Sequence, residues 1–289
     1  MKILVIGGTR YFGKRLIFNL SRKGHEVTVL SRGNTQDEFA PSVKKLIADR
    51  TDKAALEKAV AGQKFDVVID QVCMTAHDAE DAVTIFKGKT PYYLMTSTMS
   101  VYGAGESQKE SDFDPLTYTP KEPTNPAESY AEGKRAAEKV FAIKSPFKYA
   151  FARFPVVVGE DDYTQRLLGQ IQKIENNQPI YYPNLDAAFC FINSEDAAQA
   201  LEWLAENKKE GPYNFASETF KLKNLIALIE KITLKKANLL TSASKTAWSP
   251  FGVMHDWSIS SEKAESEGFA SKPNEEWLPQ LITTLSQRS

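Results

Sequence analysis

The stretch from Lys2 to Gly13 constrains the fold more than any other part of the chain. A short run of strand-forming residues, 2–6, leads directly into the turn Gly7-Gly8-Thr9-Arg10-Tyr11-Phe12-Gly13, and an amphipathic segment follows over residues 14–23. A buried strand, a glycine turn and a helix start form the unit that binds a dinucleotide pyrophosphate. We expect Gly7 to allow the tight turn and Gly13 to let the helix pack close to the strand. The N–H groups at the helix start suit an anion.

One position of this turn departs from the expected pattern. In the spacing G-x-x-G-x-x-G the middle residue is Arg10 instead of glycine. The turn alone therefore does not decide the fold, and the rest of the chain has to support it.

Strand and helix signals alternate through the first half of the chain. Further strands are expected at residues 27–30, 43–47, 65–70, 91–96 and 147–154, and helices at 52–61, 76–86 and 128–143. Apolar strands without alternation, separated by helices, indicate a parallel sheet covered on both faces. The predicted fold class is therefore α/β, a doubly wound parallel (Rossmann) sheet with its ligand cleft at the carboxyl ends of the strands.

The second half predicts a smaller C-terminal α/β lobe that binds substrate. Residues 102–126 are polar and rich in proline, so we expect a long surface loop there. Later helices are expected at 163–176, 194–207, 222–231, 261–267 and 274–285, and short strands at 180–181, 188–192, 213–215 and 237–240. We assign residues 1–158 and about 188–216 to the dinucleotide-binding domain, and about 159–187 and 217–289 to the smaller lobe.

Composition excludes several classes of function. The chain has 289 residues, is 42% hydrophobic and carries a net charge of −1, so no nucleic-acid partner is expected. No apolar run is long enough to predict a membrane span or a signal peptide, and we expect a cytoplasmic protein. Cys73 and Cys190 lie in apolar contexts and are expected to be buried free thiols. The three histidines, His25, His77 and His255, are scattered, so no metal site is expected.

Tyr130 and Lys134 carry the first candidate chemistry. On a helix, a spacing of four residues puts the phenol and the ammonium on one face. Because a nearby positive charge favours the phenolate, such a tyrosine can exchange a proton during catalysis. Tyrosine and lysine also occur at this spacing by chance in ordinary helices, so the pair alone does not decide the function.

Two strand ends supply further candidates. Thr96 and Thr98 lie at the end of the fifth strand, where hydroxyls can orient a substrate oxygen, although they can equally bind backbone. Ser31 and Arg32 end the second strand. In nucleotide-binding folds an acid at this place contacts the ribose hydroxyls, whereas an arginine accommodates a 2′-phosphate. Arg32 followed by Gly33 can also be an exposed turn.

In this order, the glycine turn, Ser31-Arg32, Thr98 and Tyr130-x-x-x-Lys134 resemble the extended short-chain dehydrogenase/reductases of the NAD-dependent epimerase/dehydratase family. The resemblance covers nearly the whole chain. The turn G-G-T-R-[FY]-x-G looks like the mark of a subgroup that includes bacterial relatives and a chloroplast RNA-binding branch. Other segments that resemble family motifs are residues 49–52, 153–159, 191–198, 213–215 and 261–269.

The resemblance implies the site residues. Thr98, Tyr130 and Lys134 match the family's catalytic residues, and the cofactor is NAD or NADP. The residues expected to bind the cofactor come from the glycine turn, the strand ends and the helix with the Tyr-Lys pair: Gly7, Thr9, Arg10, Tyr11, Phe12, Ser31, Arg32, Asp49, Arg50, Gln71, Thr96, Tyr130, Lys134, Phe154 and Val156.

Two departures from the family pattern affect the cofactor. We hypothesise that Arg10 turns toward the cofactor phosphates and, with Arg32, favours NADP over NAD. After the fourth strand, Asp70-Gln71-Val72-Cys73 replaces the family's H-L-A-A. These bulkier side chains are expected to change the wall of the cofactor site.

The resemblance implies an NAD(P)-dependent enzyme that acts on a hydroxyl or carbonyl carbon of a small molecule, with a sugar or nucleotide sugar as one candidate. Tyr130 would exchange the proton, Lys134 would favour the phenolate and contact the ribose, and Thr98 would bind the reacting oxygen. Epimerisation, dehydration and net redox all remain open. The alternative is a non-catalytic dinucleotide-binding regulator or an RNA-binding relative of the same fold. A monomer or a homodimer is expected.

Overall fold

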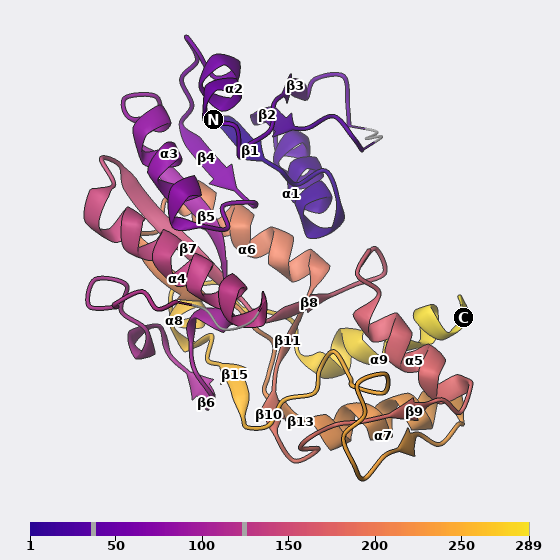
Figure 1. Cartoon of the computed structure of the whole chain (residues 1–289). Coiled ribbons are helices and arrows are strands. Elements are labelled where there is room, and N and C mark those ends of the chain that lie inside the picture. The colour runs from indigo at the N-terminus through magenta and orange to yellow at the C-terminus, as the bar shows by residue number, and fades with distance from the viewer. Residues whose placement is uncertain (36–38, 123–125, 289) are drawn as a thin grey trace. The chain divides into compact units, whose positions relative to one another are not determined.

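The computed structural model describes residues 1–35, 39–122 and 126–288 (Figure 1). The chain divides into two compact units. The first unit contains Met1–Val101, Lys109–Phe154 and Ala197–Asn214, and the second contains Tyr102–Gln108, Pro155–Asp196 and Phe215–Ser289.

The first unit is built on a seven-stranded sheet whose neighbouring strands all run parallel. In spatial order its strands are β12 (Gly211–Asn214), β7 (Lys148–Phe154), β5 (Tyr92–Thr98), β4 (Val67–Asp70), β1 (Lys2–Ile6), β2 (Glu26–Ser31) and β3 (Lys44–Ile47). The order reverses at β1, which is the topology of a doubly wound sheet. The predicted fold class is confirmed.

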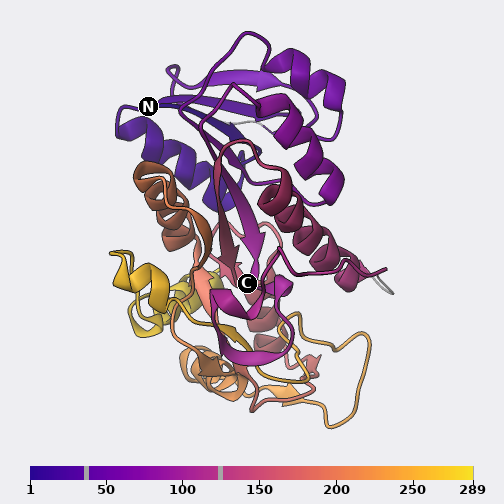
Figure 2. The same ribbon diagram turned by 90° about the vertical axis from the view of Figure 1, so that its left-hand side faces the viewer.

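Helices cover both faces of this sheet. They are α1 (Tyr11–Arg22), α2 (Lys53–Ala59), α3 (Ala76–Phe86), α4 (Pro126–Lys144) and α6 (Ser194–Asn207). Figures 1 and 2 show α3 and α4 on one side of the strands and α1 and α6 on the other. The central strands are buried along their whole length, which explains why their sequences lack an alternating pattern.

The described residues of the second unit form small sheets and helices. One sheet has the order β13 (Phe220–Lys221), β10 (Ala188–Phe189), β15 (Trp257–Ile259) and β6 (Gly105–Gln108). Two further pairs are β8 (Val156–Val158) with β11 (Phe191–Asn193), and β9 (Pro179–Ile180) with β14 (Asn238–Leu239). The helices are α5 (Arg166–Glu175), α7 (Leu222–Thr233), α8 (Glu262–Ser266) and α9 (Asn274–Ser286).

The expected loop over residues 102–126 is more ordered than the sequence indicated. It contains β6 and the short 3-10 helix η2 (Glu110–Asp112), while residues 123–125 lie outside the described residues. Strand β6 was missed because its pairing partner β15 lies about 150 residues later in the chain. A second 3-10 helix, η1 (Met99–Val101), follows β5. The unit boundaries also differ from the predicted ones, since residues 102–108, 155–158, 188–196 and 215–216 pack in the second unit.

Both cysteines lie within the described residues. Cys73 and Cys190 are buried free thiols, as predicted. Within residues 1–35, 39–122 and 126–288, no helix has both the length and the apolar character needed to cross a membrane.

Candidate functional site

The glycine turn between β1 and α1 has the close packing that its sequence predicted. Gly7 adopts φ +80°, which favours glycine. A Cβ added to Gly13 would lie 2.4 Å from the Cα of Gly8, so only glycine fits there. Tyr11 opens α1 with φ +56°, an uncommon backbone conformation for a side chain of this size. Such outliers cluster at ligand sites.

The segment after β4 forms one wall of this turn. The side chain of Val72 would lie 2.9 Å from a Cβ on Gly7, and the amide group of Gln71 would lie within 3 Å of a Cβ on Gly8 or Gly13. Gln71 and Val72, which stand where the family has leucine and alanine, therefore fill the space against the glycines.

Nε2 of Gln71 and Oγ1 of Thr96 are buried at the carboxyl ends of the strands and have no hydrogen-bond partner among the described residues. Because buried polar groups are nearly always satisfied, an amide donor and a hydroxyl left in this state fit a polar ligand. With the glycine packing and the backbone N–H groups at the start of α1, they fit a dinucleotide at these strand ends.

Arg50 lies in the interior of the first unit. Its guanidinium is 4% exposed and donates to Asp70 Oδ2 at 2.9–3.1 Å and to the carbonyl of Asp78 at 2.7 Å. The Tyr93 hydroxyl donates to the same carboxylate of Asp70 at 2.6 Å. This network shapes the segment after β4. A cofactor contact by Arg50 stays a prediction, and its guanidinium already binds a carboxylate and a carbonyl.

Ser31, Arg32 and Asp49 come from the carboxyl ends of β2 and β3. Asp49 accepts hydrogen bonds from the backbone N–H and the hydroxyl of Thr51, at 2.9 and 2.8 Å. These bonds, helped by the positive charge of Arg32, hold the pKa of Asp49 below its ordinary value. An anionic carboxylate and an arginine thus lie near each other at the corner where the sequence predicted the adenosine ribose.

Lys134 is buried in α4 and fastens this helix to the sheet. Its Nζ donates to the carbonyls of Cys73 and Thr96, each at 2.8 Å, and the residue is 2% exposed. Gly133 permits this approach, since a Cβ there would lie 2.4 Å from the carbonyl oxygen of Met74. One turn earlier on the same helix, Tyr130 is 43% exposed. The predicted pair therefore combines an anchored ammonium with an accessible phenol.

Thr98 is the last residue of β5 and is mostly buried. Its hydroxyl accepts from the backbone N–H of Ser100 at 3.1 Å and donates to the Ser100 hydroxyl at 3.2 Å. Both interpretations of this hydroxyl stay compatible with the structure, because an oxygen held by a local turn can still bind a substrate oxygen.

The remaining residues of the predicted cofactor set divide between the units. The rings of Phe12 and Phe154 contact each other edge to face at 5.8 Å in the first unit. Val156 begins β8 in the second unit and is half-buried. Thr9 and Arg10 precede α1 in the first unit, and Arg10 is exposed.

The sequence reasoning missed the other residues that hold α4 in place. Arg135 donates to the carbonyls of Val101 at 2.8 Å and Ser100 at 3.1 Å. Glu138, four residues after Lys134, is fully buried. A charged residue on the same helical face as Lys134 was the available signal, but its partners come from distant parts of the chain.

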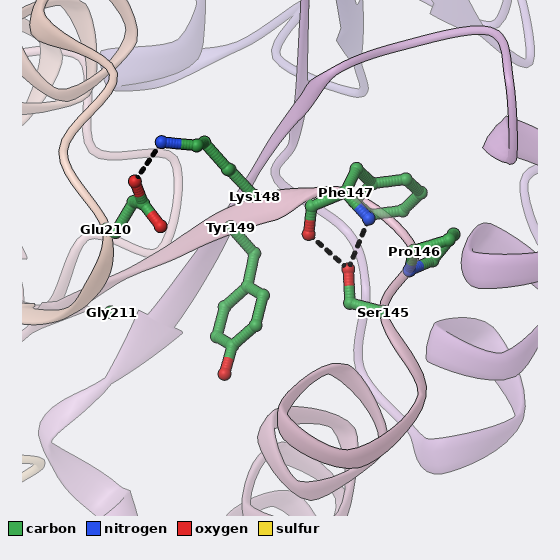
Figure 3. Close-up of a pocket in the computed structure, with 7 residues that line it drawn as sticks. All are labelled: Ser145, Pro146, Phe147, Lys148, Tyr149, Glu210 and Gly211. Carbon is green, nitrogen blue, oxygen red and sulfur yellow. Dashed lines mark hydrogen bonds and ion pairs between the residues drawn. The ribbon is translucent and has the colours of Figure 1, made fainter.

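The hollow drawn in Figure 3 lies elsewhere. It has a volume of about 470 Å³ and is lined by residues 145–149 with Glu210 and Gly211, where Lys148 pairs with Glu210 at 2.5 Å. These residues begin β7 and β12, whereas Thr98 ends β5. Because the strands are parallel, this hollow lies at the amino ends of the strands, whereas the candidate site lies at their carboxyl ends.

Comparison with known families gives a clear assignment. The family described as "NAD dependent epimerase/dehydratase family" matches residues 3–90 and 83–216, which is well over half of the chain. The chain belongs to this family. The family resemblance and the extended short-chain dehydrogenase/reductase type predicted from the sequence are thereby confirmed.

Two curated relatives match part of the chain. The chloroplast stem-loop binding protein of 41 kDa b from Arabidopsis thaliana is 31% identical over 116 residues, 35% of this chain and 30% of the relative. The 2′-dehydrokanamycin reductase from Streptomyces kanamyceticus is 30% identical over 139 residues, 48% of this chain and 37% of the relative. The chain thus aligns with only about a third of the length of these family relatives.

Solved structures of the family match the whole fold. A UDP-glucose 4-epimerase from Thermotoga maritima, crystallised with UDP-glucose, has a TM-score of 0.77 at 15% identity and covers 99% of this chain and 98% of its own. The UDP-glucose 4-epimerase from Thermus thermophilus, in complex with NAD, has a TM-score of 0.72 at 17% identity and covers 99% of both chains. At this identity the likeness establishes the fold.

Proposed function

We propose that this protein is an NAD(P)-dependent enzyme that acts on a hydroxyl or carbonyl carbon of a sugar-like small molecule. The observation that carries the proposal is the state of α4. Lys134 is buried and held by two backbone carbonyls, whereas Tyr130, one turn away, is exposed. An anchored cation beside an accessible phenol is an arrangement suited to proton exchange.

Each residue has a separate role in this proposal. Tyr130 takes up or gives a proton at the reacting oxygen, and Lys134 is a fixed cation one turn away on the same face of α4. Thr98 orients the same oxygen with its hydroxyl. Lys134 has three N–H donors, of which the carbonyls of Cys73 and Thr96 use two, so one donor is left for a ribose hydroxyl.

The cofactor belongs at the glycine turn. The amides at the start of α1 and the unpartnered Gln71 and Thr96 groups fit its polar atoms. When bound, the nicotinamide cofactor supplies hydride transfer. The proposed preference is for NADP, with Arg32 at the 2′-phosphate and Arg10 at the pyrophosphate, since arginine matches phosphate geometry.

The names of the relatives support a sugar-like substrate. The matching reductase and the two epimerases are named for an aminoglycoside and for UDP-glucose. Epimerisation and net redox at a sugar carbon both use these residue roles.

Turnover measurements test the proposal. The purified chain is incubated with NAD(H) or NADP(H) and a panel of nucleotide sugars, aminoglycosides and simple carbonyls, and product is followed by absorbance at 340 nm and by chromatography. We expect Tyr130→Phe to lower kcat by roughly 100-fold or more, the scale of general acid–base catalysis. Tyr149→Phe, at the amino ends of the strands, is the matched control and keeps full activity.

The relative named for stem-loop binding supports the alternative of an RNA-binding protein. The same samples are therefore tested for retention of stem-loop RNA. No turnover by the unmodified chain, together with tight RNA retention at moderate salt, would replace the enzymatic proposal with this alternative.

A further inference from the structure

A fully buried ion pair lies behind the candidate site. Arg153 of β7 and Glu138 of α4 are both 0% exposed. Arg153 donates to the two carboxylate oxygens of Glu138, at 3.1 Å from Nε and 2.5 Å from Nη2. This two-point geometry is the strongest form of a charge-assisted hydrogen bond.

Ser97 joins the pair from the neighbouring strand. Ser97 of β5 and Arg153 of β7 are register partners, so their side chains leave the sheet side by side. The Ser97 hydroxyl donates to Glu138 Oε1 at 2.6 Å. The Glu138 carboxylate of α4 is thus held by two adjacent strands. One of its donors, Ser97, directly precedes Thr98.

The same helix contacts the end of β5 at successive levels. Lys134 donates to the carbonyl of Thr96, Glu138 accepts from Ser97, and Arg135 donates to the carbonyl of Ser100. Lys134 and Glu138 lie four residues apart, on one face of α4. These bonds fix the position of α4 along β5, whose last residue is Thr98.

Arg153 is in turn fixed from its other side. Its guanidinium donates to the carbonyls of Glu110 at 3.1 Å and Phe113 at 3.2 Å, and lies 5.1 Å from the centre of the Phe113 ring. Glu110 accepts from the backbone N–H of Asn214 in β12 at 2.8 Å. The group therefore has little freedom to move.

A buried ion pair contributes little net stability compared with apolar side chains of similar size, because both charges lose their hydration. Stability alone is therefore a weak reason for charged groups at this place. Orientation is a stronger one, since hydrogen bonds fix direction and distance in a way that apolar contacts do not.

We propose that Ser97, Glu138 and Arg153 are positioning residues that fix where α4 lies along β5. In this position the third Lys134 N–H donor meets the cofactor ribose, and Tyr130 faces the substrate atom that Thr98 binds. This inference rests on the proposed function. None of the three residues touches the reacting atoms. They act through Lys134 and Tyr130.

Calorimetric binding of two ligands tests the inference without a substrate. One ligand is whichever of NAD and NADP binds more tightly, and the other is its matching adenosine diphosphate fragment, which lacks the nicotinamide ribose. Ser97→Ala is expected to weaken the dinucleotide about three- to tenfold, the size of one hydrogen bond, and to leave the fragment unchanged. Ser97→Thr, which keeps the hydroxyl, is expected to restore the affinity.

The control for a general loss of order is Tyr92→Phe. Tyr92 lies at the other end of β5, where its hydroxyl donates to the carbonyls of Leu204 and Lys209. This variant also loses buried hydrogen bonds from the strand, but is expected to bind both ligands normally.

A double variant tests the ion pair itself. Glu138→Leu with Arg153→Met replaces both charges by apolar groups, so no unpaired charge stays buried. If it folds, we expect a normal affinity for the fragment and a lower affinity for the dinucleotide. We also expect a lower kcat at an unchanged KM for the substrate. If it does not fold, the Ser97 variants decide.

The outcomes separate this inference from the proposed function. If the unmodified chain does not bind either dinucleotide, the proposed function fails and the inference falls with it. If it binds one, and Ser97→Ala binds the dinucleotide as tightly as the unmodified chain or loses both ligands equally, only the positioning role is overturned.

Discussion

Lys134 donates a hydrogen bond of 2.8 Å from its Nζ to the backbone carbonyl of Thr96, the residue two positions before Thr98. A second bond of equal length reaches Cys73. The lysine thus joins the helix of the predicted Tyr-Lys pair to both strand ends that border the candidate site. The same ammonium group therefore carries the charge and fixes the position of the side chain.

Replacing Lys134 by methionine is expected to affect stability and cofactor binding together. The carbonyls of Cys73 and Thr96 would lose a buried donor, which costs about 1–3 kcal/mol for an unsatisfied group. We also expect weaker dinucleotide binding and a kcat at least roughly 100-fold lower. Thermal unfolding, calorimetry and turnover measure the three effects. Lys144→Met, which removes an exposed lysine from the same helix, serves as the control, and equal behaviour of the two variants would contradict the role of Lys134.

Gly13→Ala is expected to abolish dinucleotide binding. The new Cβ would lie 2.4 Å from the Cα of Gly8, so the turn has to open. Its N–H groups then no longer point toward the pyrophosphate. Gly169→Ala is the matched control, because nothing lies within 4 Å of a Cβ there and alanine favours the helix by about 0.5–1 kcal/mol. Calorimetric titration checks the pair. Normal binding by Gly13→Ala would exclude the glycine turn as the pyrophosphate site.

Arg32→Ala is expected to weaken NADP by roughly tenfold or more and to leave NAD nearly unchanged, because a charge-assisted bond to the 2′-phosphate contributes about 1.5–3 kcal/mol. Removing Arg22, an exposed arginine in the last turn of α1, is expected to change neither affinity. Both cofactors are titrated into each variant. The proposed preference fails if the unmodified chain binds NAD more tightly than NADP.

The Glu132 carboxylate makes the stability of the first unit depend on pH in the acid range. Burial acts to raise its pKa, but hydrogen bonds from the Tyr118 hydroxyl, the Lys121 amide and Arg135 outweigh burial and lower the pKa below the ordinary value. A lowered pKa in the folded chain means that the stabilisation is present above the ordinary carboxyl pKa of about 4.3 and is lost as the pH falls.

We therefore expect Glu132→Gln to unfold at a lower temperature than the unmodified chain at pH 7, and the difference to shrink below about pH 4. Melting curves between pH 3 and 8 measure this. Glu80→Gln, whose partner Lys144 is exposed, is expected to show a much smaller effect. A difference for Glu132→Gln that grows toward low pH would contradict the assignment.

Both cysteines are expected to be inert in the folded protein. Burial raises the pKa of Cys73 and of Cys190 to about 12, so almost no thiolate is present at pH 8. A thiol reagent such as dithiobis-nitrobenzoate should therefore label neither residue in buffer and both in guanidinium. Labelling of Cys73 at the unfolded rate would show that the segment after β4 opens.

Prediction from sequence succeeded where the signal was local. The glycine turn, the alternation of apolar strands with amphipathic helices and the Tyr-Lys spacing each lie within a few residues. The parallel sheet and the family followed from their order and are confirmed, whereas the cofactor and catalytic roles of these residues stay predictions. Strand β6 and the role of the Arg50 guanidinium did not follow. The partner of β6 lies about 150 residues away, and Arg50 is bound by Asp70 and Asp78 from the next strand and helix.

The sequence by itself determined the fold class, the family, the glycine turn and which side chains carry candidate chemistry, because backbone conformation and side-chain periodicity depend on near neighbours. The tertiary structure decided how those side chains are held. Lys134 meets the carbonyl of Cys73 across 61 residues, and Ser97 meets Glu138 across 41. Such contacts depend on how the helix packs on the sheet, and the packing depends on the whole buried core.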